Sequence, residues 1–189
     1  NIMLGEINER GMQKEEVLFV GANKEYINIL LSIFETVGFR RIIAITDSGI
    51  LYLPIIAEKK EGTVAVVDIG GRQTGIYIFN DKRLRFMREI LTASESFIDA
   101  LMSEFDLSYD EAEQYAIERG FNEESKNILS FPLDRLTSEV QRTFNVYARK
   151  YPEKPVGKVY ITGRASRIPN LVSRIQDAFI EEVERLTSP

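Results

Sequence analysis

The sequence contains neither cysteine nor histidine among its 189 residues. Because there is no cysteine, the chain forms no disulfide and offers no thiol nucleophile. Because both residue types are missing, ordinary zinc sites and Ser/His/Asp or Cys/His catalysis within this chain are excluded as well. Oxygen-ligated magnesium is compatible with this composition.

Positive charge is also scarce, with 24 Lys and Arg against 29 Asp and Glu, a net charge of −5 and a pI of about 5.0. Nucleic-acid binding needs a basic surface that neutralises phosphates, so we expect no nucleic-acid partner. No apolar run approaches the roughly 18 residues that span a bilayer. With no signal peptide, the chain is expected to be soluble in a reducing compartment, and its start at Asn1 predicts a fragment of a longer protein.

A hydrophobic fraction of 44% provides material for a core, and its pattern predicts strands alternating with helices. Strands are indicated by short apolar runs between turn residues, and helices by apolar residues that recur every three or four positions. We expect strands over residues 16–21, 41–45, 63–69, 74–79, 83–90 and 158–162. We expect helices over residues 22–37 and 47–58, and further helices after residues 92, 108, 132 and 169. This mixed order predicts an α/β fold.

Local signals predict where several of these helices begin and end. Residues 92–95 and 108–111 both match the capping box, in which a hydroxyl and a carboxylate satisfy free amides at a helix start. We expect the long helix to begin near Pro132, and Pro169 to occupy the first position of the last helix. That last helix is expected to bury apolar residues as far as Val183.

The first candidate binding segment, residues 67–74, is a carboxylate followed by a glycine-rich turn. Asp68 ends an apolar strand, and Gly70 and Gly71 let backbone amides approach a phosphate. The hydroxyl of Thr74 adds a donor, and Asp68 would orient magnesium through a bound water. Taken alone, the segment favours an ordinary hairpin whose glycines permit positive φ.

The second candidate segment, residues 159–171, is an apolar strand that leads through Gly163 into a helix. Such a turn can lie flat under a nucleobase or ribose, and the helix N-terminus adds a favourable dipole. Any strand–turn–helix connection has the same pattern. The two segments in this order, about ninety residues apart, are more specific than either one.

Together the two segments resemble the actin-like ATPase superfamily. Residues 68–71 match its second phosphate motif, and residues 163–171 match its adenosine motif. Within that superfamily the chain most resembles the type IV pilus assembly protein family PilM, and more distantly the division protein family FtsA. Further similar segments are residues 17–39, 62–89, 107–113 and 139–171, so the resemblance covers most of the chain.

The resemblance implies an actin-like ATPase (ribonuclease H-like) fold, seen here in part. Residues 1–46 would belong to a small subdomain of FtsA/PilM type that is inserted into the first lobe. Residues 47–61 would connect it to the second lobe, residues 62–189, of which 106–131 would be the helical portion. Most of the first lobe, with the first phosphate motif, would lie outside this chain.

The resemblance also implies a function as a scaffold of the bacterial type IV pilus assembly platform, cytoplasmic and peripheral at the inner-membrane face. The implied partner is the cytoplasmic tail of a PilN-like bitopic membrane protein, and a pilus assembly ATPase and self-association are further candidates. The implied cofactors are ATP and magnesium, with no catalytic residue assigned. The implied nucleotide-binding residues are Asp68, Gly70, Gly71, Arg72, Thr74, Glu113, Gly163 and Arg164, with magnesium held through water by Asp68.

Three departures from the family pattern predict that this nucleotide site is degenerate. Arg164 follows Gly163 where the adenosine motif usually has a second glycine, and this side chain would either block the base or stack on it. Ala116 stands where a lysine usually lies near the nucleotide. Arg72 and Gln73 replace a turn rich in hydroxyls. We therefore expect weak ATP binding and little or no hydrolysis.

Several alternatives stay open at the level of sequence. Arg72, Arg164 and Arg167 would form an anion-binding cluster if they share one cleft, whereas the simpler interpretation is solvated surface arginine. An active ATPase or a sugar kinase of the same superfamily is the alternative function, and it requires catalytic groups outside this chain. A relative from type II secretion or from FtsA-like division is the third interpretation.

Overall fold

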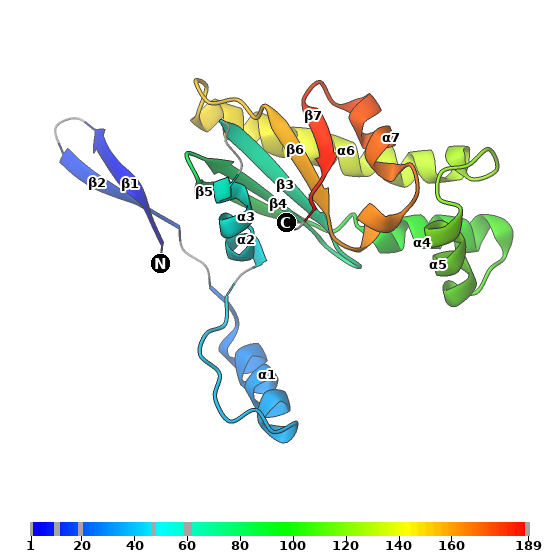
Figure 1. The fold of residues 1–189 in the computed structure, drawn as a ribbon, viewed down its shortest axis with the longest axis horizontal. Helices are drawn as coiled ribbons and strands as arrows, with labels where there is room; N and C mark the ends of the chain where they lie inside the picture. The colour runs from blue at the N-terminus through cyan, green and yellow to red at the C-terminus, as the bar shows by residue number, and fades with distance from the viewer. Residues whose placement is uncertain (1, 10–11, 19–20, 47, 59–61, 188–189) are drawn as a thin grey trace. The chain divides into compact units, whose positions relative to one another are not determined.

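The computed structural model describes residues 2–9, 12–18, 21–46, 48–58 and 62–187 (Figure 1). The chain divides into two compact units, residues 1–51 and 52–189, which are described separately. Within the described residues, no helix has both the length and the apolar character that crossing a membrane requires.

The first unit contains a two-stranded antiparallel sheet and two helices. Strand β1 (Ile2–Glu9), which was not predicted, pairs with β2 (Met12–Leu18). The strand expected over residues 16–21 is present over residues 16–18, residues 19–20 lie outside the described residues, and Gly21 is not in a strand. Helix α1 (Lys24–Thr36) begins at Asn23, whose side chain accepts a hydrogen bond from the Glu25 amide at 2.8 Å. Helix α2 (Ser48–Leu51) follows at the end of the unit.

The strand expected over residues 41–45 is absent from the structure, so this prediction was wrong. A strand requires a partner for its backbone amides and carbonyls, and in the described part of the chain β1 and β2 pair only with each other. Ile43 is accordingly 86% exposed. The apolar pattern of these residues predicts a strand, but no neighbouring strand is available among the described residues.

The second unit is built on a five-stranded mixed sheet in the order β5-β4-β3-β6-β7. The strands expected over residues 63–69, 74–79 and 83–90 are confirmed, and they form a meander in which neighbouring strands pair antiparallel. On the other side of β3, β6 and β7 pair parallel. The strands are β3 (Thr63–Ile69), β4 (Thr74–Asn80), β5 (Arg83–Ile90), β6 (Lys158–Thr162) and β7 (Glu182–Arg185). Strand β7 was not predicted, and Val183 lies on it rather than on the last helix.

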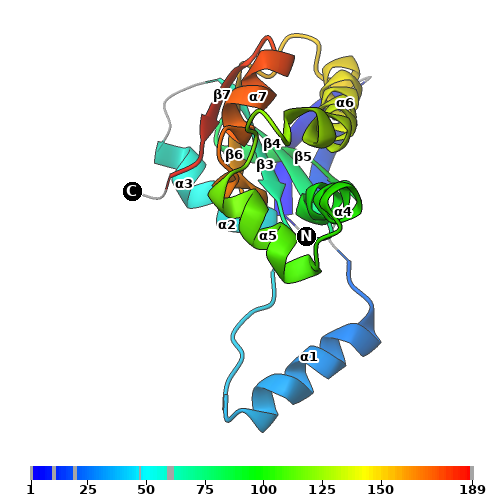
Figure 2. The same cartoon turned by 90° about the vertical axis from the view of Figure 1, so that its right-hand side faces the viewer.

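Helices cover both faces of this sheet, as Figure 2 shows with α4 and α6 on one side and α3 on the other. One face contributes alternate residues such as Val67 and Ile78 to the main core. The other face carries Val66 and Tyr77, which are also buried. The helices are α3 (Leu53–Glu58), α4 (Ser94–Phe105), α5 (Tyr109–Glu118), α6 (Lys126–Lys150) and α7 (Leu171–Ala178).

Two predicted helix starts need correction. Helix α6 begins at Lys126, well before Pro132, because the apolar face already includes the buried Leu129. A proline inside a helix removes a single backbone donor, and the packing of this face outweighs that loss. Helix α7 begins at Leu171 rather than at Pro169, since Asn170 adopts a left-handed conformation with φ of 64°.

Candidate nucleotide site

The two candidate segments lie side by side in the second unit. Strands β3 and β6 run parallel, with Asp68 paired to Thr162, so both strands end at the same edge of the sheet. The turn at Gly70 and Gly71 follows β3, and Gly163 follows β6 into the short 3₁₀ helix η1 (Arg164–Arg167). The carboxyl ends of parallel strands are the usual place for a ligand site in α/β folds. The structure thus brings together segments that are about ninety residues apart.

Gly163 is held in a conformation that only glycine adopts readily, with φ of 84° and ψ of −175°. A Cβ atom at this position would lie 2.3 Å from Oδ1 of Asp68 and 2.6 Å from the carbonyl oxygen of Ile69. The backbone of the second segment therefore packs directly on the end of β3. This close approach explains why the turn after β6 begins with glycine.

Asp68 accepts a hydrogen bond from a residue that the sequence did not single out. The hydroxyl of Tyr52 donates to Oδ2 of Asp68 at 2.7 Å, and the Tyr52 ring packs 5.7 Å from that of Tyr77. Burial, and then the hydrogen bond to Asp68, raise the pKa of the Tyr52 hydroxyl. Tyr52 lies in the segment expected to be a mere connection, so no motif indicated it. One carboxylate oxygen of Asp68 is already engaged.

The glycine turn after β3 is tied to the start of α4 by backbone hydrogen bonds. The amides of Ser94 and Glu95 donate to the carbonyl oxygens of Gly70 and Gly71, each at 3.0 Å. This arrangement replaces the capping box expected over residues 92–95, because α4 begins after Ala93 and has no side-chain cap. The turn thus satisfies amides that the capping box would have satisfied.

Thr74 is fully buried at the start of β4, although the sequence predicted it to be a phosphate donor. Its hydroxyl donates to the carbonyl oxygen of Thr92 at 2.7 Å. In this structure the side chain therefore fastens β4 to the segment before α4. A role of Thr74 in nucleotide binding stays a prediction that would require this bond to be exchanged.

Two ion pairs surround Gly71. Arg164 pairs with Glu113 on α5, and Nη1 of Arg164 would lie 4.0 Å from a Cβ at Gly71. Arg72 Nε lies 3.3 Å from Oε1 of Glu95. The structure thus unites the predicted residues Glu113, Arg164 and Arg72 with Glu95, which the sequence pattern indicated only as part of a cap.

These ion pairs bear on the expected arginine cluster. Arg72 and Arg164 do share one neighbourhood, but a carboxylate lies beside each of them. Arg167 is exposed on η1. The local charge is therefore close to balanced rather than strongly positive, and an anion would have to compete with Glu95 and Glu113.

The glycine turn is open at one position, but its first amide is engaged, because the Gly70 amide donates to the carbonyl oxygen of Gln73 at 3.1 Å. The glycine turn leaves room at Gly71, where the nearest atom to an added Cβ is 3.8 Å away. The Arg164–Glu113 pair spans from the second segment to α5 close to this turn, where a polyphosphate would meet a carboxylate. Within the described residues there is no group of three or more acidic side chains that could hold a metal ion directly. The contact of Asp68 with magnesium through water stays a prediction, and Tyr52 engages one of its two carboxylate oxygens.

Comparisons with known proteins agree with this architecture. The family model described as type IV pilus assembly protein PilM matches residues 4–184. A solved PilM–PilN type IV pilus biogenesis complex contains a similar chain, with a TM-score of 0.76, 19% identity, and coverage of 88% of this chain and 48% of that chain. A search of curated protein sequences found no match.

Two further similar structures are described as bound to nucleotides. MreB 5 of Spiroplasma citri bound to AMPPNP has a TM-score of 0.64 and 16% identity, covering 87% of this chain and 60% of its own. The archaeal actin homolog Ta0583 in complex with ADP has a TM-score of 0.55 and 18% identity, and the match covers 74% of this chain and 49% of the Ta0583 chain. At these identities the likeness establishes the actin-like fold alone. The chain spans only 48% to 60% of these solved chains.

Proposed function

This chain belongs to the type IV pilus assembly protein PilM family, and we propose that it acts there as a scaffold rather than as an efficient enzyme. The observation that carries the proposal is the family match over residues 4–184, which includes both units. The second unit supplies a well-packed sheet with helices on both faces, a rigid body suited to protein–protein contact. A cytoplasmic location at the inner-membrane face is part of this proposal.

The proposed partner is the cytoplasmic tail of a PilN-like membrane protein. Support comes from the similar solved chain, which is described as a PilM–PilN complex. In keeping with the actin-like fold, residues 1–46 would belong to an inserted small subdomain and residues 62–189 to the second lobe. Other members of the assembly platform and a second copy of the chain are further candidate partners.

We further propose that ATP, with magnesium, binds weakly at the edge formed by Asp68, the Gly70–Gly71 turn and Gly163. The fold supports nucleotide binding, since related actin-like structures are described with AMPPNP and ADP. Glu95 and Glu113 oppose it, because a phosphate would have to displace them from Arg72 and Arg164. Bound nucleotide would brace the site, and no residue of this chain is assigned a catalytic step.

A two-part titration tests the proposal with the intact protein that contains this chain. The first part measures binding of a synthetic PilN-like tail peptide, which is expected to bind in the absence of nucleotide. The second part is calorimetric titration with magnesium-ATP, using Asp68→Ala as a control and a phosphate-release assay for turnover. Absence of tail binding would refute the scaffold proposal. Tight ATP binding with rapid turnover would instead support the alternative of an active ATPase.

A further inference from the structure

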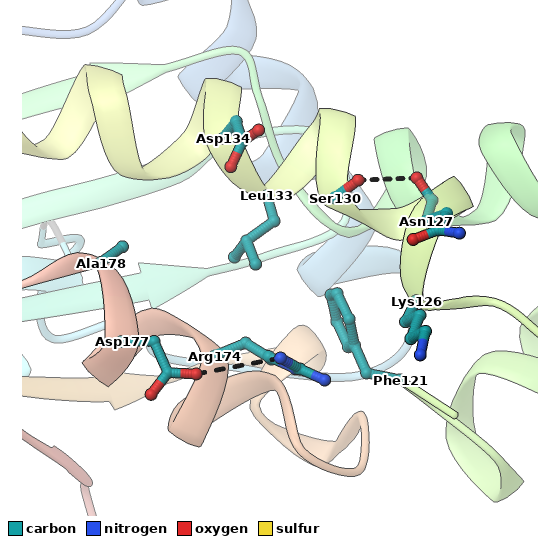
Figure 3. A pocket seen from close by; sticks show the side chains of 9 residues that line it. All are labelled: Phe121, Lys126, Asn127, Ser130, Leu133, Asp134, Arg174, Asp177 and Ala178. Atoms are coloured by element: carbon teal, nitrogen blue, oxygen red, sulfur yellow. Dashed lines mark hydrogen bonds and ion pairs between the residues drawn. The ribbon is translucent and has the colours of Figure 1, made fainter. Parts of the chain in front are cut away.

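The second unit contains a pocket of about 370 Å³ that lies outside the candidate nucleotide site (Figure 3). It is formed between the N-terminal half of α6 and helix α7, with Phe121 from the loop that follows α5. Phe121 and Leu133 are buried residues that contribute apolar surface, and Ala178 lies at the end of α7. The volume is within the usual range of ligand pockets.

The pocket is preformed because α7 is attached at both of its ends. Before its start, the Phe121 amide donates to the Pro169 carbonyl at 3.2 Å, and the Asn170 side chain donates to the Phe121 carbonyl at 3.1 Å. At its end, the side chain of Gln141 on α6 donates to the carbonyl oxygen of Ala178 at 2.8 Å. The space between the two helices is therefore fixed by the fold.

Charged side chains of both signs line the pocket. Lys126 lies in the first turn of α6 and Asp134 two turns later, an axial separation of about 12 Å. Figure 3 shows the guanidinium of Arg174 directed toward the side of Lys126 and Phe121, whereas Asp177 and Asp134 lie toward the opposite side. The pocket thus has Lys126 and the Arg174 guanidinium toward one end and Asp134 toward the other, with a carboxylate beside each of the two cations.

The charged groups at the two ends can be recruited at small cost. Arg174 Nη1 lies 3.9 Å from Asp177 Oδ2, and their side chains are 45% and 70% exposed. Lys126 pairs with Glu123, whose side chain is 90% exposed. Exposed ion pairs of this kind contribute little, so a ligand with complementary charges can replace them.

We propose that this pocket binds a short peptide segment of a protein partner. The segment carries an apolar side chain between one acidic and one basic residue. The acidic residue pairs with Lys126 and Arg174, the apolar side chain packs against Phe121 and Leu133, and the basic residue pairs with Asp134. In an extended segment, charged residues four positions apart span roughly 13 Å, which is close to the axial separation of Lys126 and Asp134 along α6. None of the residues that line this pocket belongs to the candidate nucleotide site.

Three labelled heptapeptides test the proposal with the whole chain by fluorescence anisotropy. Their sequences are Ser-Glu-Ala-Phe-Ala-Lys-Ser and two versions with either two glutamates or two lysines at the charged positions. The mixed-charge peptide is expected to bind about tenfold more tightly than either of the others. The variant Ala178→Trp, which fills the end of the pocket at an exposed position, is expected to abolish this binding.

Reversing the charge of acidic residues at the pocket tests the proposal more directly than the comparison of peptides alone. Asp134→Lys combined with Asp177→Lys makes both ends cationic and is expected to shift the preference to the peptide with two glutamates. The control Asp99→Lys with Glu104→Lys makes the same charge change at exposed positions of α4 and is expected to leave the preference unchanged. Equal binding of the three peptides, no binding at millimolar concentration, or an unchanged preference after reversal would each overturn the proposal.

Discussion

Gly163 determines how closely the two segments of the candidate site approach each other. Its φ is 84°, and a Cβ atom added to it would lie only 2.3 Å from Oδ1 of Asp68, which leaves no space for a side chain. The sequence marked this glycine by its place in a motif. The reason for it is local and steric, because the turn packs on the end of β3.

Gly163→Ala is therefore expected to lower the free energy of unfolding by about 2–3 kcal/mol, from backbone strain and from displacement of the Asp68 carboxylate. Urea denaturation measures this change. Gly71→Ala is the matched control, because an added Cβ there meets no atom closer than 3.8 Å. Equal losses in the two variants would show that the close packing of Gly163 is not what the second unit depends on.

Glu113 and Arg164 form the ion pair that most directly affects an anionic ligand at this site. Replacing the carboxylate with a neutral amide in Glu113→Gln releases the Arg164 guanidinium for phosphate. We expect magnesium-ATP affinity to rise by roughly tenfold, the change produced by about 1.4 kcal/mol. Calorimetric titration of the intact protein measures it.

Arg164→Gln serves as the complementary variant. It leaves the Glu113 carboxylate without its cation, so ATP affinity is expected to fall rather than rise. An increase in affinity with Arg164→Gln would instead mean that the arginine acts as a steric block. The two variants thus distinguish the two roles, blocking or contacting the nucleotide, that the sequence leaves open for this residue.

At the scale of elements, the two predicted capping boxes had different outcomes. The box at the start of α5 is confirmed, since Ser108 and Glu111 exchange both hydrogen bonds. The box at the start of α4 is absent, because the Gly70–Gly71 turn accepts the free amides of that helix. The local pattern is the same in both places. The difference arises from whether another part of the chain reaches the helix start.

The α5 box makes stability depend on pH. Hydrogen bonds from the Ser108 hydroxyl and amide lower the pKa of Glu111 below 4.5, so its folded-state pKa is depressed relative to the unfolded chain. This contribution is present above about pH 4.5 and is lost as the pH falls through the folded pKa. Glu111→Gln is expected to be less stable than the parent at pH 7, and the difference is expected to shrink toward pH 3.

Chemical denaturation at the two pH values measures this effect. Glu104→Gln, at an exposed position of α4, controls for the general loss of one carboxylate. If the stability difference caused by Glu111→Gln is the same at pH 3 as at pH 7, the ionised carboxylate is not what caps α5.

At the scale of the whole molecule, the chain divides at residues 51 and 52, ten residues before the expected start of the second lobe. The second unit includes Tyr52, which donates to Asp68, and Ile56, which is only 3% exposed. These residues belong to the segment that covers the second face of the sheet. The boundary of a stable fragment therefore depends on packing that the linker-like sequence does not reveal.

A fragment of residues 52–189 is expected to fold by itself and to be more stable than a fragment of residues 62–189. The shorter fragment loses the burial of Ile56 and the Tyr52–Tyr77 ring contact, together about 2–4 kcal/mol. Urea denaturation of the two fragments measures the difference. Equal stability would place the true boundary at residue 62 and would make Tyr52 and Ile56 dispensable.

The sequence by itself determined the α/β class, the strands β3 to β5 and the two glycine turns. The class and the strands follow from short-range periodicity, and the turn at Gly163 follows from a backbone conformation that glycine adopts readily. Only the tertiary structure decided that residues 41–45 form no strand and that Val183 lies on β7. It also decided that Tyr52 contacts Asp68, and that Arg164 pairs with Glu113 beside Gly71. Strand pairing and ion pairs depend on partners that are distant in the sequence, and the chain's local pattern carries no information about which partner arrives.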